Sequence, residues 1–162
     1  MATVGIVMGS TSDWEVMKEA AQVCKDFGIS YSARALSAHR TPVELEEWMM
    51  EMEKSGCIAF IAGAGAAAHL AGVVAAKTIL PTFGVPIPSK YLKGLDSLLA
   101  MVQMPKGIPV STLAIGEAGA ANAALSVVAI LALHDKAMKE KLIQFRKTQA
   151  EKVRNSVLPE LA

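Results

Sequence analysis

The chain has 162 residues, and its 16 Lys and Arg against 15 Asp and Glu leave a formal net charge of +1. At about 150 residues per domain, this length predicts a single domain, residues 1–162, large enough to bury its own core. The balanced charge argues against nucleic acid as a partner, and the hydrophobic share of 52% excludes a disordered chain.

Strand and helix patterns alternate from the start of the chain. The apolar run 4–8 predicts a strand. Ser12 and Glu15 then have the spacing of a capping box and predict a helix that ends before Gly28. A second strand is expected over 29–36, and its mixed composition favours a position near a sheet edge.

The same alternation continues to the C-terminal part of the chain. Thr41 is a suitable N-cap, with Pro42 and Glu44 in the first turn, so a helix is expected to about residue 55. The fully apolar run 58–62 predicts a central strand. The remaining expected elements are helix 70–79, strand 82–85, helix 95–101, strand 109–114, and helices 118–133 and 136–154.

Strands that alternate with helices form parallel sheets with helices on both faces. Five strands in about 130 residues predict an α/β, three-layer αβα fold, with a flavodoxin-like parallel five-stranded sheet in the order 2-1-3-4-5. Ligands of such sheets bind beyond the carboxyl ends of the strands. The loops that follow the strands are therefore expected to carry the function.

The apolar content raises the question of a membrane location. Two stretches, 57–76 and 108–133, carry one charge at most, but each contains glycine pairs and fits a buried strand followed by an alanine-rich helix. We therefore expect no membrane contact. Cys24 and Cys57 lie in apolar segments and indicate reduced, buried thiols, and no signal peptide is visible, so a cytoplasmic protein is expected.

The loop after the first strand, 9–13, contains Ser10, Ser12 and Asp13. Backbone N–H groups at the start of a helix bind anions such as phosphate, and the serine hydroxyls add donors. Asp13 favours the helix dipole and could also bind ribose hydroxyls. Ser12 could instead serve only as the helix cap.

The loop after the second strand contains Ser37, Ala38, His39 and Arg40. The guanidinium of Arg40 is a bidentate donor suited to phosphate or carboxylate. His39 can exchange a proton near neutral pH, as a general acid or base must. The alternative is an exposed loop in which neither side chain has a function.

The third loop, 63–69, presents Ala64, Gly65 and Ala66, whose small size lets a ligand approach the backbone closely, and ends at His69. His69 is either a second polar contact or a structural histidine. The three loops together predict a small-molecule site. The dispersed histidines have no metal-ligand spacing, so no metal is expected. The sequence also contains neither a P-loop nor the serine elbow of acyl-transfer enzymes.

Several motifs in this order resemble those of one family, the bacterial class I N5-carboxyaminoimidazole ribonucleotide mutases (PurE) of purine synthesis. The similarity spans about residues 4–133. Its motifs are Met8-Gly9-Ser10-Thr11-Ser12-Asp13-Trp14, Ser37-Ala38-His39-Arg40-Thr41-Pro42, Ala62-Gly63-Ala64-Gly65, Ala68-His69-Leu70, Gly94-Leu95-Asp96-Ser97-Leu98-Leu99, Val102-Gln103-Met104-Pro105 and Ala114-Ile115-Gly116.

The resemblance implies an isomerase that moves a carboxyl group from the exocyclic nitrogen of the substrate to carbon 4 of its imidazole. The family reaction proceeds by decarboxylation and recarboxylation, without a metal or organic cofactor. His39 matches the general acid and base of the family. The apolar loop 63–68 would hold carbon dioxide and exclude water.

The resemblance also implies substrate-binding residues. Arg40, Ser12 and Ser37 would bind the ribose phosphate, Asp13 the ribose hydroxyls, and Ser10 would lie near the carboxylate. The remaining expected contacts are Ala38, Ala64, Gly65, Ala66 and His69.

Two positions depart from the family pattern. Ala66 and Ala71 stand where the family usually has Gly and Pro. The added methyl group of Ala66 leaves the contact of that loop with substrate open. Related class II enzymes carboxylate aminoimidazole ribonucleotide directly with carbon dioxide and usually have Lys at the position of Arg40, so Arg40 favours class I, with a class II carboxylase as the alternative.

The family forms octamers, and the sequence favours self-association as well. The expected helix 118–133 has no polar face, which indicates a subunit contact. The resemblance implies that this self-association is a homo-octamer. The last helix either packs on its own domain or reaches a neighbouring subunit. A nucleotide-binding regulatory module and a flavin protein of the same fold remain as alternative functions; the first has no need of a proton-transfer group such as His39, and the second would be coloured.

Overall fold

The computed structural model describes residues 3–159, which form two compact units. The first unit ends at Leu125 and the second begins at Ser126, within one helix. The first unit contains the whole sheet and all the loops discussed above. That residues 1–162 act as one domain stays a prediction.

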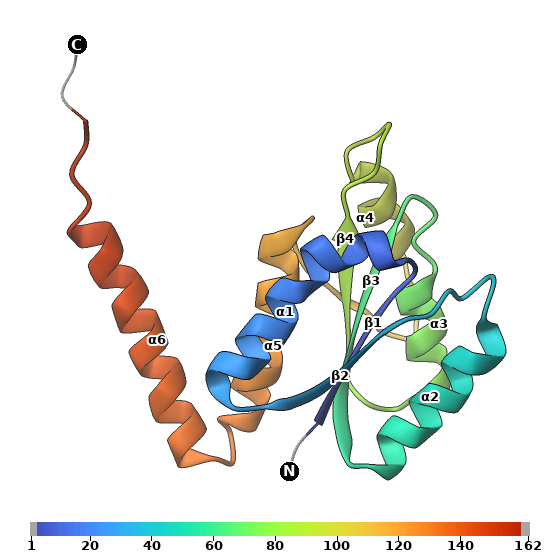
Figure 1. Cartoon of the computed structure of the whole chain (residues 1–162), viewed down its shortest axis with the longest axis horizontal. Helices are drawn as coiled ribbons and strands as arrows, with labels where there is room; N and C mark the ends of the chain where they lie inside the picture. The colour runs from blue at the N-terminus through green and yellow to red at the C-terminus, as the bar shows by residue number, and fades with distance from the viewer. Residues whose placement is uncertain (1–2, 160–162) are drawn as a thin grey trace. The chain divides into compact units, whose positions relative to one another are not determined.

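The first unit is built on one parallel sheet, drawn in Figure 1. Its order among the described residues is β2-β1-β3-β4-β5, which confirms the predicted flavodoxin-like topology. The edge position of the second strand and the central position of the third are also as predicted. The strands are β1 (Thr3–Met8), β2 (Ser30–Ala35), β3 (Cys57–Gly65), β4 (Thr82–Ile87) and β5 (Ser111–Thr112).

Helices follow the strands in the predicted alternation. They are α1 (Trp14–Phe27), preceded by the short 3-10 helix η1 (Thr11–Asp13), α2 (Pro42–Lys54), α3 (Leu70–Lys77), α4 (Leu95–Val102), α5 (Glu117–Leu131) and α6 (Lys136–Arg154). Gly28 ends α1 in the left-handed conformation with φ 74°, as predicted. Among residues 3–159, no helix has the length and apolar composition needed to cross a membrane.

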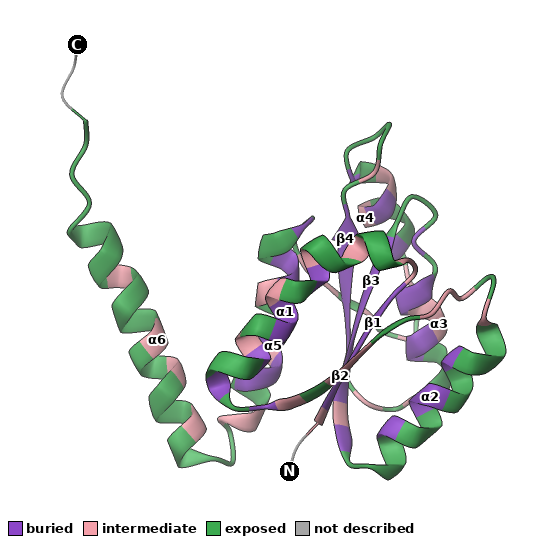
Figure 2. Cartoon of the chain, in the orientation of Figure 1, coloured by how far each residue is buried: buried purple, intermediate pink, exposed green. Residues whose placement is uncertain are grey.

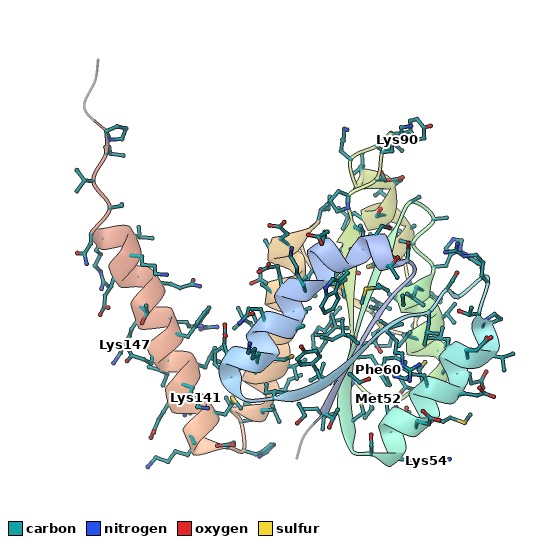
Figure 3. All side chains as sticks on the ribbon, in the orientation of Figure 1. Met52, Lys54, Phe60, Lys90, Lys141 and Lys147 are labelled. Carbon is teal, nitrogen blue, oxygen red and sulfur yellow. The ribbon has the colours of Figure 1, made fainter. Side chains whose placement is uncertain are left out.

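Side chains from α2, α3 and α4 form one core with the sheet. Trp48 of α2 packs edge-on against Phe60 of β3, with ring centroids 5.7 Å apart. Figure 3 labels Phe60 and Met52, two members of this core. Gly5 leaves room for the Phe60 ring, which a Cβ atom at that position would meet at 2.5 Å. Figure 2 shows the buried residues concentrated on the strands and on the sides of the helices that face them.

The opposite face of the sheet packs against α1. Met17 of α1 fills the space above Gly63 of β3, where a Cβ atom would collide with the methionine sulfur. Cys24 of α1 and Cys57 of β3 are buried free thiols, as predicted, and burial raises the pKa of Cys24 to about 11. Neither thiol is therefore set up as a nucleophile.

Strand lengths differ most from the prediction at β3 and β5. β3 continues to Gly65 rather than ending at residue 62, because Gly63, Ala64 and Gly65 pair with β4. The residues expected to form a loop are thus held rigidly in the sheet. β5 has two paired residues rather than six, because β4 accepts partners from it only at Phe83 and Gly84.

The helix expected to be apolar all round is α5. Within the first unit, Ala120, Ala123 and Ala124 are fully buried, whereas Asn122 is exposed. The helix therefore has a buried side and an exposed side in this chain. α6, in the second unit, has the predicted bounds and no buried residue.

Candidate active site

The loops after β1, β2, β3 and β4 surround a cavity of about 360 Å³ at the carboxyl edge of the sheet. All but two of the predicted site residues line it: Ser10, Asp13, Ser37, Ala38, His39, Arg40, Ala64, Gly65 and Ala66. The two exceptions, Ser12 and His69, contact lining residues. The gathering of these loops follows from the topology, since parallel strands bring their carboxyl ends to one edge.

The helix cap at the first loop is Ser10, not Ser12. The Ser10 hydroxyl oxygen accepts the N–H of Ser12, and the Asp13 carboxylate accepts the N–H of Ser10, which together form a capping box. The 3-10 helix η1 precedes α1 and moves the cap two residues toward the N-terminus. Ser12 is thereby released from capping, and its hydroxyl donates to the Ser10 oxygen at 2.9 Å.

Among residues 3–159, Asp13 is the one carboxylate that lines the cavity. Burial raises its pKa above the ordinary value of 3.8, against the opposing effect of hydrogen bonds from Ser10, Ser12 and Gly9. A raised pKa in the folded state means that stability is highest when the carboxyl is protonated. This contribution is lost as the pH rises through the folded pKa.

We therefore expect Asp13→Asn to unfold at higher urea concentration than the unsubstituted protein at pH 7.5. Asparagine retains an oxygen that can accept the Ser10 N–H and carries no charge to desolvate. The difference should shrink toward pH 4, where aspartate itself becomes protonated. Urea unfolding at both pH values measures this; a difference that grows on acidification would contradict the role of burial.

The loop after β2 is tied to the loop after β1 by Arg40. Its Nη2 donates to the carbonyl of Gly9 at 3.0 Å, and its Nε donates to the Ser37 hydroxyl at 3.3 Å. Thr41 precedes α2, but its side chain does not cap that helix; its Oγ1 accepts the Ser37 N–H and donates to the Ser37 carbonyl. The predicted cap thus closes the loop that carries His39.

His39 and His69 lie together although thirty residues separate them. Nε2 of His39 is 3.0 Å from Nδ1 of His69, and the two rings are nearly perpendicular. A hydrogen bond between these atoms requires a proton on one nitrogen and a lone pair on the other. The contact therefore orients the His39 ring toward the loop after β3 and gives its Nε2 a hydrogen-bond partner.

The turn after β3 is strained at Ala66, which has φ 55° in the left-handed region. This conformation costs a residue with a Cβ atom roughly 1–2 kcal/mol, which glycine avoids. The backbone N–H of Ala66 is fixed by a hydrogen bond to the Ser97 hydroxyl at 2.9 Å. The added methyl group noted in the sequence is therefore accommodated at a cost in stability.

We expect Ala66→Gly to raise the free energy of unfolding by about 0.5–1 kcal/mol, since relief of strain exceeds the extra entropy of the unfolded chain. The matched control is Ala67→Gly, because Ala67 has no positive φ and should lose stability instead. Urea unfolding of both variants measures the two changes. Equal losses would show that Ala66 is not strained.

One wall of the cavity was missed by the sequence analysis. It is formed by Ile87 at the end of β4 and by the loop that follows, which contributes Pro88, Ser89 and Lys90. The same carboxyl-edge rule that selected the other loops applies to β4 and could have found it. Figure 3 labels Lys90 on this loop. Lys90 adds a cation to the cavity lining, in addition to Arg40.

The β4 loop is ordered by the start of α4. The Ser89 hydroxyl donates to Asp96 at 2.6 Å and accepts the N–H of Gly94, and the bond from Ser89 lowers the pKa of Asp96. Among residues 3–159, no group of three or more His, Cys, Asp or Glu side chains could hold a metal ion. The cavity thus offers proton exchange at His39, cations for an anionic ligand, and an apolar wall.

These features, on a flavodoxin-like sheet, are typical of an enzyme whose substrate is an anionic small molecule. The chain belongs to the AIR carboxylase family, whose model matches residues 3–152.

Three curated relatives of this chain share one name. N5-carboxyaminoimidazole ribonucleotide mutase of Saccharolobus solfataricus is 53% identical over 98% of this chain and 96% of the relative. Those of Brucella melitensis and Escherichia coli K12 are 56% and 51% identical, over 93% and 94% of this chain and 93% and 90% of the relatives. The crystal structure of Treponema denticola PurE superposes with a TM-score of 0.85 at 30% identity, over 94% of each chain.

Proposed function

We propose that this chain is an N5-carboxyaminoimidazole ribonucleotide mutase of purine biosynthesis. It would convert its substrate to 4-carboxy-5-aminoimidazole ribonucleotide, an isomerase reaction. Relatives of that name are more than half identical over nearly the whole chain, which supports the proposal. The observation that carries it is His39, held by His69 at the cavity wall beside Arg40.

The substrate is an anionic nucleotide, and the proposed binding mode follows the charges of the lining. Arg40, Ser37 and Ser12 bind the ribose phosphate, since they supply a guanidinium and two hydroxyls at the first two loops. Asp13 accepts hydrogen bonds from the ribose hydroxyls. Ser10 lies near the carboxylate, and Ala38, Ala64, Gly65, Ala66 and His69 complete the contacts.

His39 acts as general acid and then as general base. As the bond between the exocyclic nitrogen and the carboxyl carbon breaks, His39 delivers a proton to that nitrogen and carbon dioxide is released. Carbon 4 of the imidazole then bonds to carbon dioxide, and His39 removes the proton from carbon 4. The proton lost in the first step is regained in the second, so no metal or organic cofactor is part of the proposal.

Carbon dioxide must stay in the cavity between the two steps. The wall at Ala64, Ala66, Ala67 and Leu70 is apolar and supports a small pocket that holds the molecule while excluding water. Ala64 and Leu70 are buried, and their packing in the core keeps this wall rigid.

We propose further that the chain works as one mutase domain in a cytoplasmic homo-octamer. Leu95, Leu99 and Val102 lie four and three residues apart on α4 and are each about half exposed, which supports a subunit contact. Ile130 and Leu133 in the second unit are also exposed. α6 would then pack against a neighbouring subunit.

Turnover of freshly prepared N5-carboxyaminoimidazole ribonucleotide, beside an assay with aminoimidazole ribonucleotide and bicarbonate, tests the function. The mutase predicts fast conversion of the first and only slow reaction of the second. The reverse would indicate a class II carboxylase, and inactivity of folded protein in both assays would favour a regulatory nucleotide-binding module. Flavin absorbance of the purified protein would overturn a cofactor-free enzyme.

A further inference from the structure

We propose that Ser97, outside the cavity lining, is a positioning residue whose hydroxyl holds the strained Ala66 turn and thereby sets the geometry of the catalytic cavity. The proposal rests on the proposed function of the same site. Ser97 lies in the first turn of α4, and the mechanism above makes no use of it.

Ser97 is fully buried, and its hydroxyl joins two walls of the cavity. Its oxygen accepts the N–H of Ala66 at 2.9 Å and donates its own proton to the carbonyl of Ile87 at 2.7 Å. Ala66 and Ile87 both line the cavity. One buried group therefore fixes the turn after β3 relative to the end of β4.

The Ala66 turn needs such a support because its φ of 55° is unfavourable for a residue with a Cβ atom. Without the hydroxyl, the N–H of Ala66 would lose its partner, and the turn would gain by relaxing toward a negative φ. Glycine at this position would have no such tendency. The requirement for the Ser97 hydroxyl should therefore depend on the residue at position 66.

The turn is also connected to the catalytic pair. The carbonyl of Ala66 accepts the N–H of Ala68, and the carbonyl of Ala67 accepts the N–H of His69. His69 in turn contacts His39 at 3.0 Å. A shift of Ala66 would thus move the apolar wall and the partner of the general acid and base together.

The experiment compares four proteins: the unsubstituted enzyme, Ser97→Ala, Ala66→Gly, and the double variant. We expect Ser97→Ala to lower kcat by roughly 10- to 100-fold, the scale of a misplacement of about 1 Å, with a smaller change in KM. Whatever activity Ala66→Gly itself has, adding Ser97→Ala to it should lower kcat by less than about tenfold, a smaller loss than Ser97→Ala causes with alanine at position 66. Ser97→Cys, which retains a weak donor, should fall between serine and alanine.

Thr82→Val is the matched control. Thr82 is buried like Ser97, and its hydroxyl donates to the carbonyl of Leu80 at the opposite end of β4. It should lose thermal stability without losing kcat. If Thr82→Val lowers kcat as much as Ser97→Ala, or if the loss from Ser97→Ala is the same with Ala and Gly at position 66, the positioning role is wrong.

Hydrogen exchange of the peptide segment 63–69, measured by mass spectrometry, keeps this test separate from the proposed function. Ser97→Ala should speed exchange in that segment by about tenfold or more, because the N–H of Ala66 loses the hydrogen bond that protects it. Thr82→Val should not change exchange in this segment. If the unsubstituted protein has no mutase activity but Ser97→Ala still speeds exchange, the proposed function is wrong and the support of Ala66 by Ser97 stands. Unchanged exchange would overturn the support itself.

Discussion

Replacing His39 with asparagine should lower kcat by roughly 10²- to 10⁴-fold, the usual contribution of a general acid or base. The proposed reaction uses this group twice, to protonate the exocyclic nitrogen and to deprotonate carbon 4. Asparagine has a similar size and can still hydrogen-bond to His69, but it cannot exchange a proton near neutral pH. Substrate affinity should stay within a few-fold, because other residues bind the phosphate in the proposed binding mode.

Steady-state kinetics together with equilibrium binding of the substrate separates the two effects. The comparison variant is His69→Asn, which removes the partner of His39 and should lower kcat less than His39→Asn does. Unchanged turnover of His39→Asn would exclude His39 as the proton carrier. If His39→Asn loses substrate binding but little kcat, His39 is a ligand contact. If it retains binding and loses turnover, the regulatory nucleotide-binding module is excluded.

The sheet and its loops could be predicted because the hydrophobic pattern is periodic. Each apolar strand is bounded by turn residues. Alternation with helices predicts a parallel sheet, and five strands in about 130 residues favour the order β2-β1-β3-β4-β5 that the structure has. The helix cap at Ser10 could not be predicted, because two serines two residues apart satisfy the same rule and the 3-10 helix decides between them. The end of β3 was misjudged because a run of glycine and alanine fits a strand as well as a loop.

Contacts between distant residues are the part of the site that the sequence does not contain. His39 and His69 belong to different loops, and only the packing of α3 beside the β2 loop fixes their distance of 3.0 Å. The bonds of Ser97 to Ala66 and Ile87 likewise depend on where α4 lies. Residue types indicate which chemistry is available, whereas the three-dimensional packing decides which groups meet.

Two unfavourable features of the free protein meet at the same cavity. The carboxylate of Asp13 is desolvated, and Ala66 is held with a positive φ. Such costs are tolerated where a ligand needs a fixed arrangement of groups, and they are compensated by packing elsewhere, here by the buried residues of α2, α3 and β3. Substitutions that relieve either cost are therefore expected to trade stability against function.

Arg40→Lys should raise KM by roughly 10- to 100-fold, because a guanidinium supplies two directed hydrogen bonds to phosphate, each worth about 1.5–3 kcal/mol when charged. Lysine retains the charge but not the fork. It also loses the bonds from Arg40 to Gly9 and Ser37 that join the first two loops. The matched control is Arg34→Lys, an exposed arginine of β2 outside the cavity lining, which should leave KM unchanged.

The same variant decides whether Arg40 binds the phosphate or selects the reaction. N5-carboxyaminoimidazole ribonucleotide and aminoimidazole ribonucleotide share the ribose phosphate and differ in the carboxyl group. If Arg40 holds the phosphate, Arg40→Lys must weaken the binding of both substrates by the same factor and leave the ratio of the two activities unchanged. A ratio that shifts toward direct carboxylation would place the guanidinium at the reacting carboxyl group, since only there could it favour one source of carbon dioxide over the other.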